Sequence, residues 1–189
     1  MDEPHLEARH SASLTPQLTL LTAVALCRAM RTVAKVPAGI KWPNDILING
    51  RKVSGILLES SAEDERLQHV IAGVGISANL REEDYPSELK PVATSLLLES
   101  GSPVEREELI AAFLNEWEEL YGLYRREGFS PIRTLWEALS ISIGRTFQVR
   151  TPQGEQEGTV SGLDPSGALL LISTQTGKEI KIYSGEIGG

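Results

Sequence analysis

A lysine and an aspartate lie close together in a stretch of the chain that is predicted to be rigid. Asp45 stands before one apolar run, 46–48, and Lys52 stands before a second, 53–58. The Asn49-Gly50 pair between the runs accepts positive φ angles, so the stretch predicts a tight β-hairpin. A cation and a carboxylate on adjacent strands of one hairpin suit a site that handles phosphate or a hard cation such as Mg²⁺.

The same residues also have a purely structural explanation. Asp45 follows Pro43 and Asn44, and short polar side chains in such a position shape turns by bonding nearby backbone amides. Lys52 can extend its charged end into water while its stem covers apolar surface. From the hairpin residues alone, the structural and the chemical explanation both stay open.

A second feature is a glycine-containing strand over residues 69–77, predicted to be buried on both faces. Gly73 and Gly75 are two residues apart, so they face the same side of that strand. Their missing side chains let a ligand or another stretch of backbone approach closely, and both alternatives stay open.

Composition bounds the class of protein. The chain has 189 residues, 41% hydrophobic and 23% charged, which indicates a soluble globular protein. A net charge of -8 without a basic stripe argues against nucleic-acid binding. The single cysteine, Cys27, lies in an apolar helical pattern, which favours a core position and a reducing, cytoplasmic compartment. No apolar run approaches the ~20 residues of a membrane span, so no membrane association is expected.

The spacing of apolar residues predicts four helices. Thr15 and Ser102 are the expected N-caps of the first and third, each followed by a proline at the first helical position. Residues 1–13 are polar and predict a frayed terminus, and residues 62–66 predict a polar turn. The predicted helices cover residues 16–34, a short segment within 91–99, 103–126 and 130–139.

The pattern changes to short strands after Gly144. Turn residues separate these runs, which is typical of a small SH3-type barrel. We therefore predict an α/β (α+β) chain with a first domain over residues 1–141 and a β domain over 142–189. The expected strands cover residues 146–150, 156–163, 168–173 and 179–183.

Several motifs together resemble the biotin protein ligase family. The most specific are K-W-P-N-D at Lys41–Asp45 and R-K-V-S-G-I at Arg51–Ile56, joined through the Asn-Gly turn. The resemblance runs from about Pro16 into the C-terminal barrel. It implies a catalytic domain with a mixed sheet and flanking helices, similar to class II aminoacyl-tRNA synthetases, followed by an SH3-like domain. The other matching segments are 73–79, 93–96 and 184–187.

The resemblance implies a two-step reaction. Biotin is activated with Mg²⁺ and ATP to biotinyl-5'-AMP, and biotin is then transferred to a lysine of the biotin carboxyl carrier domain of a carboxylase. Lys52 matches the essential lysine, which also contacts biotin. The other positions implied to contact biotin are Gly55, Ile56, Gly73 and Gly75. Those implied to contact ATP are Lys41, Asn44, Asp45, Ser77, Asn79 and Glu186, with Asp45 also near the metal.

Two departures from the family pattern qualify these expectations. Ser77 replaces the first asparagine of the family's G-I-N-x-N strand motif, while Asn79 retains the second. The family's Gly/Arg-rich loop has no counterpart in residues 1–13, which hold Arg9 and no glycine. We therefore expect a catalytic domain shortened at its N terminus, with an open pocket and an open sheet edge that favours pairing into a homodimer. A catalytically inactive binding or dimerisation module is the alternative function, whereas a ligand-sensing transcription factor would need a DNA-binding element that these residues lack.

Overall fold

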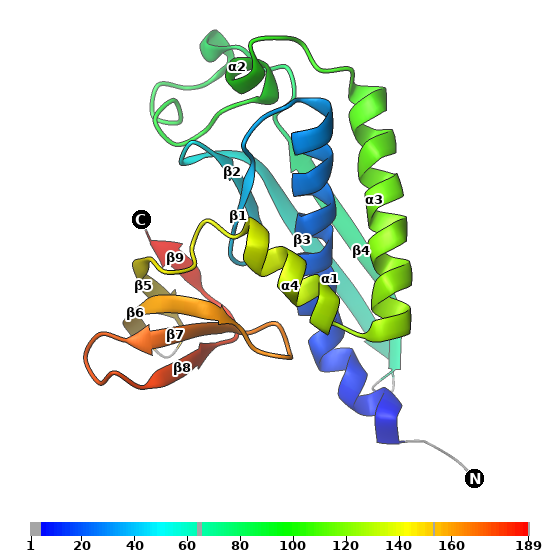
Figure 1. Cartoon of the computed structure of the whole chain (residues 1–189), viewed down its shortest axis with the longest axis vertical. Helices are drawn as coiled ribbons and strands as arrows, with labels where there is room; N and C mark the ends of the chain where they lie inside the picture. Colours follow the sequence, from blue (N-terminus) through cyan, green and yellow to red (C-terminus); the bar gives the residue numbers. More distant parts are fainter. Residues whose placement is uncertain (1–4, 64–65, 153, 189) are drawn as a thin grey trace.

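The computed structural model describes the backbone of residues 5–63, 66–152 and 154–188, and the side chains of residues 14–61, 68–152 and 154–185. A four-stranded antiparallel sheet of order β1-β2-β3-β4 lies against a helical layer, and a five-stranded antiparallel sheet of order β8-β7-β6-β5-β9 follows (Figure 1). The first sheet consists of β1 (Gly39–Lys41), β2 (Asp45–Ile48), β3 (Arg51–Glu63) and β4 (Arg66–Ile76). The helices are α1 (His5–Val33), α2 (Leu96–Ser100), α3 (Arg106–Glu127) and α4 (Ser130–Leu139), with a short 3-10 helix at Glu82–Asp84. The second sheet consists of β5 (Thr146–Thr151), β6 (Gly154–Leu163), β7 (Leu169–Ser173), β8 (Glu179–Ile182) and β9 (Glu186–Gly188).

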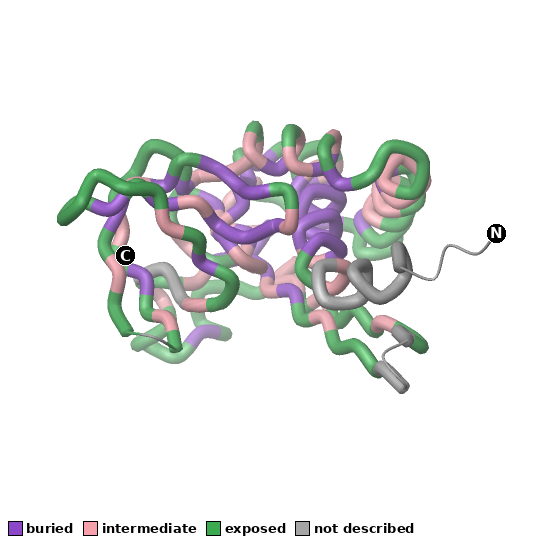
Figure 2. The backbone as a smooth tube through the Cα atoms, turned by 90° about the horizontal axis from the view of Figure 1, so that it is seen from below, coloured by how far each residue is buried: buried purple, intermediate pink, exposed green. Residues whose placement is uncertain are grey.

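Helix α1 forms the centre of the core, because the sheet covers one of its sides and α3 and α4 cover others. Buried positions accordingly concentrate on α1 and the adjoining strands, whereas α3 is largely exposed (Figure 2). Cys27 on α1 is fully buried, and this burial raises the pKa of its thiol to about 11 although nearby Arg31 lowers it. The cysteine therefore has the core position expected from the sequence.

The first helix begins earlier than predicted. It starts at His5, and Pro16 lies inside it, so the predicted N-cap at Thr15 is wrong. The predicted frayed terminus is also wrong for residues 5–13, while its first four residues lie outside the described part. Proline at this position removes one backbone donor, the amide that would bond to the carbonyl of Ala12, while its fixed φ matches the helix. A single missing hydrogen bond does not end a helix whose following turns are buried.

The central hairpin forms as predicted, but its partner strands extend further. Asn49 and Gly50 make the turn with φ angles of 50° and 80°. Strands β3 and β4 continue into the predicted turn at residues 62–66, of which 64–65 lie outside the described part. The prediction that the glycine strand is buried on both faces is wrong, since Gly73 and Gly75 are exposed and Ile71 is 58% exposed on the face away from α1.

Helix α3 starts at Arg106, four residues after the predicted N-cap Ser102. The side-chain amide of Asn79 bonds both backbone groups of Val104: its Nδ2 donates to the carbonyl at 2.9 Å, and its Oδ1 accepts from the amide at 2.8 Å. These bonds hold Val104 in a non-helical backbone, so the local proline and capping signals do not decide where the helix begins.

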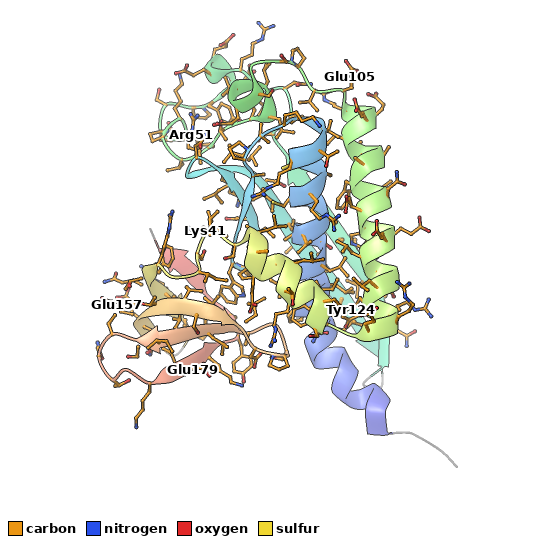
Figure 3. All side chains as sticks on the ribbon, viewed as in Figure 1. Lys41, Arg51, Glu105, Tyr124, Glu157 and Glu179 are labelled. Carbon is orange, nitrogen blue, oxygen red and sulfur yellow. The ribbon has the colours of Figure 1, made fainter. Side chains whose placement is uncertain are left out.

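The second sheet contacts the helical layer through the turn between β6 and β7. Gln17 on α1 donates to the carbonyl of Pro165 at 3.1 Å and accepts from the hydroxyl of Tyr124 at 2.6 Å. Tyr124 lies near the end of α3 (Figure 3). Four of the five strands were expected, and β9 was not. Within the described residues, no helix combines the length and apolar character that crossing a membrane requires.

Asp164 holds this turn together and predicts a pH dependence of stability. Burial alone would raise the pKa of Asp164, but hydrogen bonds from Ser166, Lys181 and Ala168 outweigh it, so the pKa lies below its usual 3.8. The folded state therefore binds fewer protons than the unfolded state near this pH, and the contribution is complete above about pH 4 and lost as the pH falls through the folded pKa. We expect the free energy of unfolding, measured in urea between pH 3 and pH 6, to fall less steeply on acidification in Asp164→Asn than in the unaltered chain. Glu119→Gln, on the exposed side of α3, is the control and should reproduce the original slope.

Candidate ligand site

The open face of the first sheet carries a row of four predicted site residues, one from each strand. The register pairs Lys41 with Asp45, Asp45 with Gly55, and Gly55 with Gly75. Residues directly opposite one another in an antiparallel sheet point to the same face. The structure therefore brings together a cation, a carboxylate and two glycines whose separation along the chain is up to 34 residues, from Lys41 to Gly75.

A β-bulge adds Lys52 to this row. Between β2 and β3 the register shifts so that Val53 and Ser54 together oppose Ile46, and all three are buried. By strict alternation from Gly55, Lys52 would face the core; the extra residue returns it to the open face. There its Nζ lies 2.6 Å from Oδ1 of Asp45. The lysine side chain is 51% exposed, so its charged end remains accessible to a ligand.

The glycines create an even surface beside this ion pair. A side-chain carbon on Gly73 or Gly75 would meet only backbone oxygens, at 3.6 Å and 4.0 Å, so packing does not require glycine there. A side-chain carbon on Gly55 would instead lie 3.2 Å from Nζ of Lys52. Leu57, 62% exposed, and Ile71 project from the same face and flank the strip of glycines with apolar surface. The strip thus offers space for a flat, largely apolar group that ends near a cation.

A cavity of about 260 Å³ adjoins this face between the two sheets. Asn44 forms part of its wall and is held by two hydrogen bonds to the backbone of Ile56 in β3. The side-chain Nδ2 of Asn44 donates to the carbonyl of Ile56 at 2.7 Å, and the backbone carbonyl of Asn44 accepts from the amide of Ile56 at 3.0 Å. Lining residues from the two sides include Trp42, Pro43, Leu57, Tyr183 and Gly185. Helix α1 adds Thr15, Pro16, Thr19 and Leu20, so the first sheet, the barrel and α1 form the cavity together. A larger hollow of about 460 Å³ on the barrel contains none of the predicted residues, so size alone does not identify the site.

The remaining predicted residues have other surroundings. The side chain of Ile56 is buried on the helix-facing side of β3, and its part in the cavity is as wall. Ser77 is half-buried just after β4, and its backbone bonds Val53 and Leu96. Asn79 uses its amide to hold Val104. Glu186 pairs with Arg150 in the barrel, and its side chain lies outside the described part.

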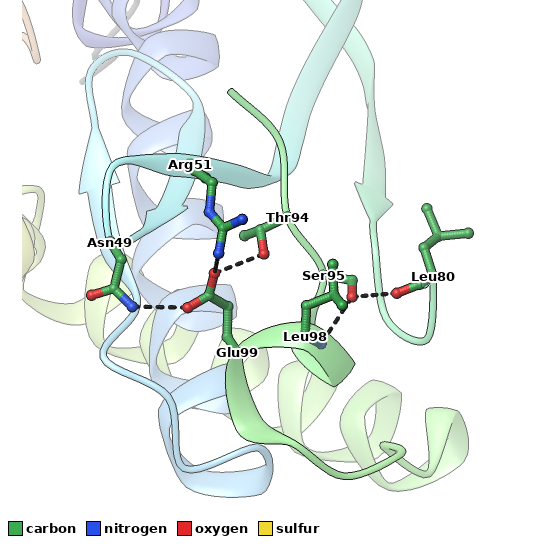
Figure 4. Close-up of polar contacts among 7 residues, drawn as sticks. All are labelled: Asn49, Arg51, Leu80, Thr94, Ser95, Leu98 and Glu99. Atoms are coloured by element: carbon green, nitrogen blue, oxygen red, sulfur yellow. Dashed lines mark hydrogen bonds and ion pairs between the residues drawn. The ribbon is translucent and has the colours of Figure 1, made fainter. Parts of the chain in front are cut away.

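The sequence interpretation missed an acidic residue next to the hairpin. Glu99 accepts hydrogen bonds from Asn49, Arg51 and Thr94, so it neutralises Arg51 and leaves Lys41 and Lys52 as the cations of the row (Figure 4). Only the position of an acid at the end of the apolar run 96–98 pointed to it, and that signal is weak. Its partners lie up to 50 residues away along the chain.

This arrangement fits the binding of an anion beside an apolar group. Two lysines and one carboxylate give the row a local positive charge in a chain whose net charge is -8. Within the described residues, no group of three His, Cys, Asp or Glu side chains is close enough to hold a metal by itself. A phosphate-bearing ligand that supplies most of the oxygens around its own Mg²⁺ would need only one carboxylate from the protein, and Asp45 is available for that purpose.

Comparison with protein families gives two matches. Residues 5–77 match the model of the biotin/lipoate A/B protein ligase family, and residues 142–187 match the biotin protein ligase C-terminal domain. The first match includes all four strands of the first sheet and therefore the whole row. The second includes strands β5 to β8 and most of β9.

Individual relatives agree with these matches. The bifunctional ligase/repressor BirA of Bacillus spizizenii is 46% identical over 92% of this chain and 53% of its own length. The biotin--[acetyl-CoA-carboxylase] ligase of Paracoccus denitrificans is 37% identical over 88% of this chain and 70% of its own. The chain thus spans about half the length of the Bacillus relative.

Among solved structures, the biotin protein ligase of Aquifex aeolicus in complex with biotin and ATP is 26% identical and superimposes with a TM-score of 0.79. The superposition covers 97% of this chain and 74% of that one. The likeness confirms the predicted fold class, a synthetase-like α/β layer followed by an SH3-like β domain.

Proposed function

Because this chain belongs to the biotin protein ligase family, we propose that it activates biotin with ATP and transfers it to a lysine of a carboxylase carrier domain. The observation that carries the proposal is the row Lys41–Asp45–Gly55–Gly75 with Lys52 beside it on the open face. It places a cation at the end of an apolar strip, which suits a carboxylate attached to a largely apolar ring system.

In the first step, an oxygen of the biotin carboxylate bonds to the α-phosphorus of ATP, and pyrophosphate leaves. Negative charge builds on the phosphoryl oxygens as this happens. Lys52, held in place by Asp45 at 2.6 Å, would stabilise that charge electrostatically while also orienting the carboxylate. Gly55, Gly73 and Gly75 would allow the rings of biotin to lie directly on the sheet.

The nucleotide would occupy the side of the row nearest the cavity. Lys41 and Asn44 lie at that side, and the barrel contributes Tyr183 and Gly185 to the opposite wall. Oδ1 of Asp45 faces Lys52, so its other oxygen would hold the Mg²⁺ that accompanies ATP and reduces charge repulsion at the phosphates. We extend the proposal to nucleotide contacts from Ser77 and Asn79, next to the end of β4, and from Glu186 in β9.

In the second step, the amine of an acceptor lysine bonds to the activated carbonyl carbon, the carbon–oxygen bond to phosphate breaks, and AMP leaves with loss of a proton from nitrogen. The open face gives such a lysine access to the strip. We also propose a biotin carboxyl carrier domain as the acceptor, which the names of carboxylase ligases among the relatives support. We further propose a cytoplasmic location, which the free, buried cysteine suits. Division into domains at residue 142 is supported by the two separate sheets and by the extent of the C-terminal match.

Isotope exchange tests the first step directly. The purified chain is incubated with ATP, Mg²⁺ and labelled pyrophosphate, with and without biotin, and label in ATP is counted. We expect label to enter ATP only when biotin is present. Lipoate replaces biotin in a parallel sample, because the matched family includes lipoate ligases. Exchange with lipoate alone would show that lipoate, not biotin, is the substrate. No exchange with either compound would favour the alternative function, an inactive binding module.

A further inference from the structure

Glu99, near the end of α2, is a nearly buried carboxylate with three hydrogen-bond donors. Its side chain is 5% exposed. Oε1 accepts from Nη2 of Arg51 at 2.6 Å and from the hydroxyl of Thr94 at 2.7 Å, and Oε2 accepts from Nδ2 of Asn49 at 2.8 Å (Figure 4). Burying a carboxylate is costly unless it is paired and hydrogen-bonded, so this arrangement persists only while the donors stay in place.

The three donors surround Lys52 along the backbone. Asn49 and Arg51 precede it in the hairpin, and the amide of Thr94 donates to the carbonyl of Lys52 at 2.9 Å. The amide of Lys52 in turn donates to the carbonyl of Val92 at 2.8 Å. Glu99 therefore links Arg51, which precedes Lys52 in the chain, to Thr94, which bonds the backbone of Lys52.

This support lies beyond the end of β4, on the edge of β3 that β4 no longer covers. The last residue pair between β3 and β4 is Ser54 with Ile76, so β4 offers no partner to the backbone of Lys52. The segment 92–94 occupies that edge instead and forms a parallel bridge between Ala93 and Lys52. Glu99 links that segment to the hairpin turn, and the link includes a charge-assisted bond, which is stronger than a neutral one.

The same short helix also holds the end of β4. The hydroxyl of Ser95 donates to the carbonyl of Leu80 at 2.6 Å and accepts from the amide of Leu98 at 3.1 Å. The amide of Leu96 donates to the carbonyl of Ser77 at 2.9 Å. Helix α2 therefore contacts both sides of the candidate site, the lysine side through Glu99 and the β4 side through Ser95.

We propose that Glu99 is a positioning residue for Lys52, acting through Arg51 and Thr94 to hold the lysine where the biotin carboxylate and the α-phosphate of ATP meet. The proposal rests on the proposed function and adds to it a residue that does not itself contact substrate. Misplacement of a reacting group by about 1 Å can cost 100-fold in rate, so a support of this kind has a measurable kinetic effect.

The test is the substitution Glu99→Gln, which keeps the size of the side chain and removes its charge. We expect kcat of biotin-dependent pyrophosphate exchange to fall at least about tenfold with KM for biotin nearly unchanged, because the lysine matters most as charge develops in the transition state. Amide hydrogen exchange at Lys52 and Thr94 should become faster than in the unaltered chain. The matched control is Glu116→Gln, since Glu116 is also a carboxylate paired with an arginine, 3.0 Å from Nε of Arg28, but it joins α1 to α3.

The outcomes separate the two proposals. Undiminished kcat in Glu99→Gln, with an unchanged amide exchange rate at Lys52, would overturn the positioning role while leaving the proposed function intact. Equal losses of kcat in Glu99→Gln and Glu116→Gln would also overturn it, because they would indicate general destabilisation. Absence of exchange in the unaltered chain would overturn the proposed function and the kinetic role together. If Glu99→Gln does not fold, Thr94→Val removes one donor at nearly constant shape and should lower kcat in the same direction.

Discussion

Biotin-dependent pyrophosphate exchange is expected to fall at least about 100-fold when Lys52 is replaced by alanine, since preorganised charges at a transition state commonly contribute that much. The lysine is the cation of the row nearest the glycine strip, and its partner Asp45 holds it there at 2.6 Å. Removing it leaves the carboxylate of Asp45 without a counter-charge beside two incoming anions. Both the loss of attraction and the new repulsion therefore act against the first step.

The control for this substitution is Lys178→Ala, an exposed lysine before β8 that lies in the barrel and outside the row. Its exchange rate should equal that of the unaltered chain. Circular dichroism and urea unfolding should show both variants folded, because the side chain of Lys52 is 51% exposed. Unchanged turnover in Lys52→Ala would show that the catalytic role assigned to this residue is wrong.

The substitution Gly75→Val should separate the binding of biotin from folding. A side-chain carbon at Gly75 has only the carbonyl of Gly55 as a near neighbour, at 4.0 Å, so the folded chain can accommodate it. Valine also favours strands, and the free energy of unfolding should stay equal or increase by about 0.5–1 kcal/mol. The same methyl groups would occupy the strip on which biotin is proposed to lie, and we expect biotin affinity by calorimetry to fall about 10- to 100-fold.

Gly158 in β6 provides the opposite control. A side-chain carbon there would lie 2.7 Å from the carbonyl of Ile172, a backbone atom that cannot move without shifting β7. Gly158→Ala should therefore lower the free energy of unfolding by about 1–3 kcal/mol and leave the affinity of the folded protein for biotin unchanged. Undiminished biotin affinity in Gly75→Val would place the ligand elsewhere than on the glycine strip.

Local signals in the sequence predicted much of this architecture. The Asn-Gly pair predicted the hairpin and the placement of Asp45 and Lys52 on its adjacent strands. The short strands after Gly144 were also recognisable from their turns. In each case the signal and its structural result lie within about a dozen residues of each other.

Features that depend on residues far apart in the chain could not be predicted from local sequence signals. The start of α3 is decided by Asn79, 25 residues before Val104, which overrides a proline and a capping signal that are locally correct. The open face of β4 reflects where α1 packs rather than the composition of the strand. Glu99 contacts Arg51 over 48 residues, and nothing near Glu99 in the sequence indicates that its carboxylate is buried with an arginine as partner.

The bulge at Val53 also changes how strand patterns of this type should be interpreted. Lys52 and Gly55 are three residues apart, a spacing that in a regular strand puts two side chains on opposite faces. Here they share a face because the bulge adds one residue, Val53, to β3. The alternation of side chains between the two faces is therefore shifted by one position. Changes in length on the turn side of Val53 would alter the turn and leave the glycine strip facing outward. A single insertion within β4 between Gly73 and Gly75 would instead put these two glycines on opposite faces. Length variation is therefore tolerated at the hairpin turn and not within the glycine strip.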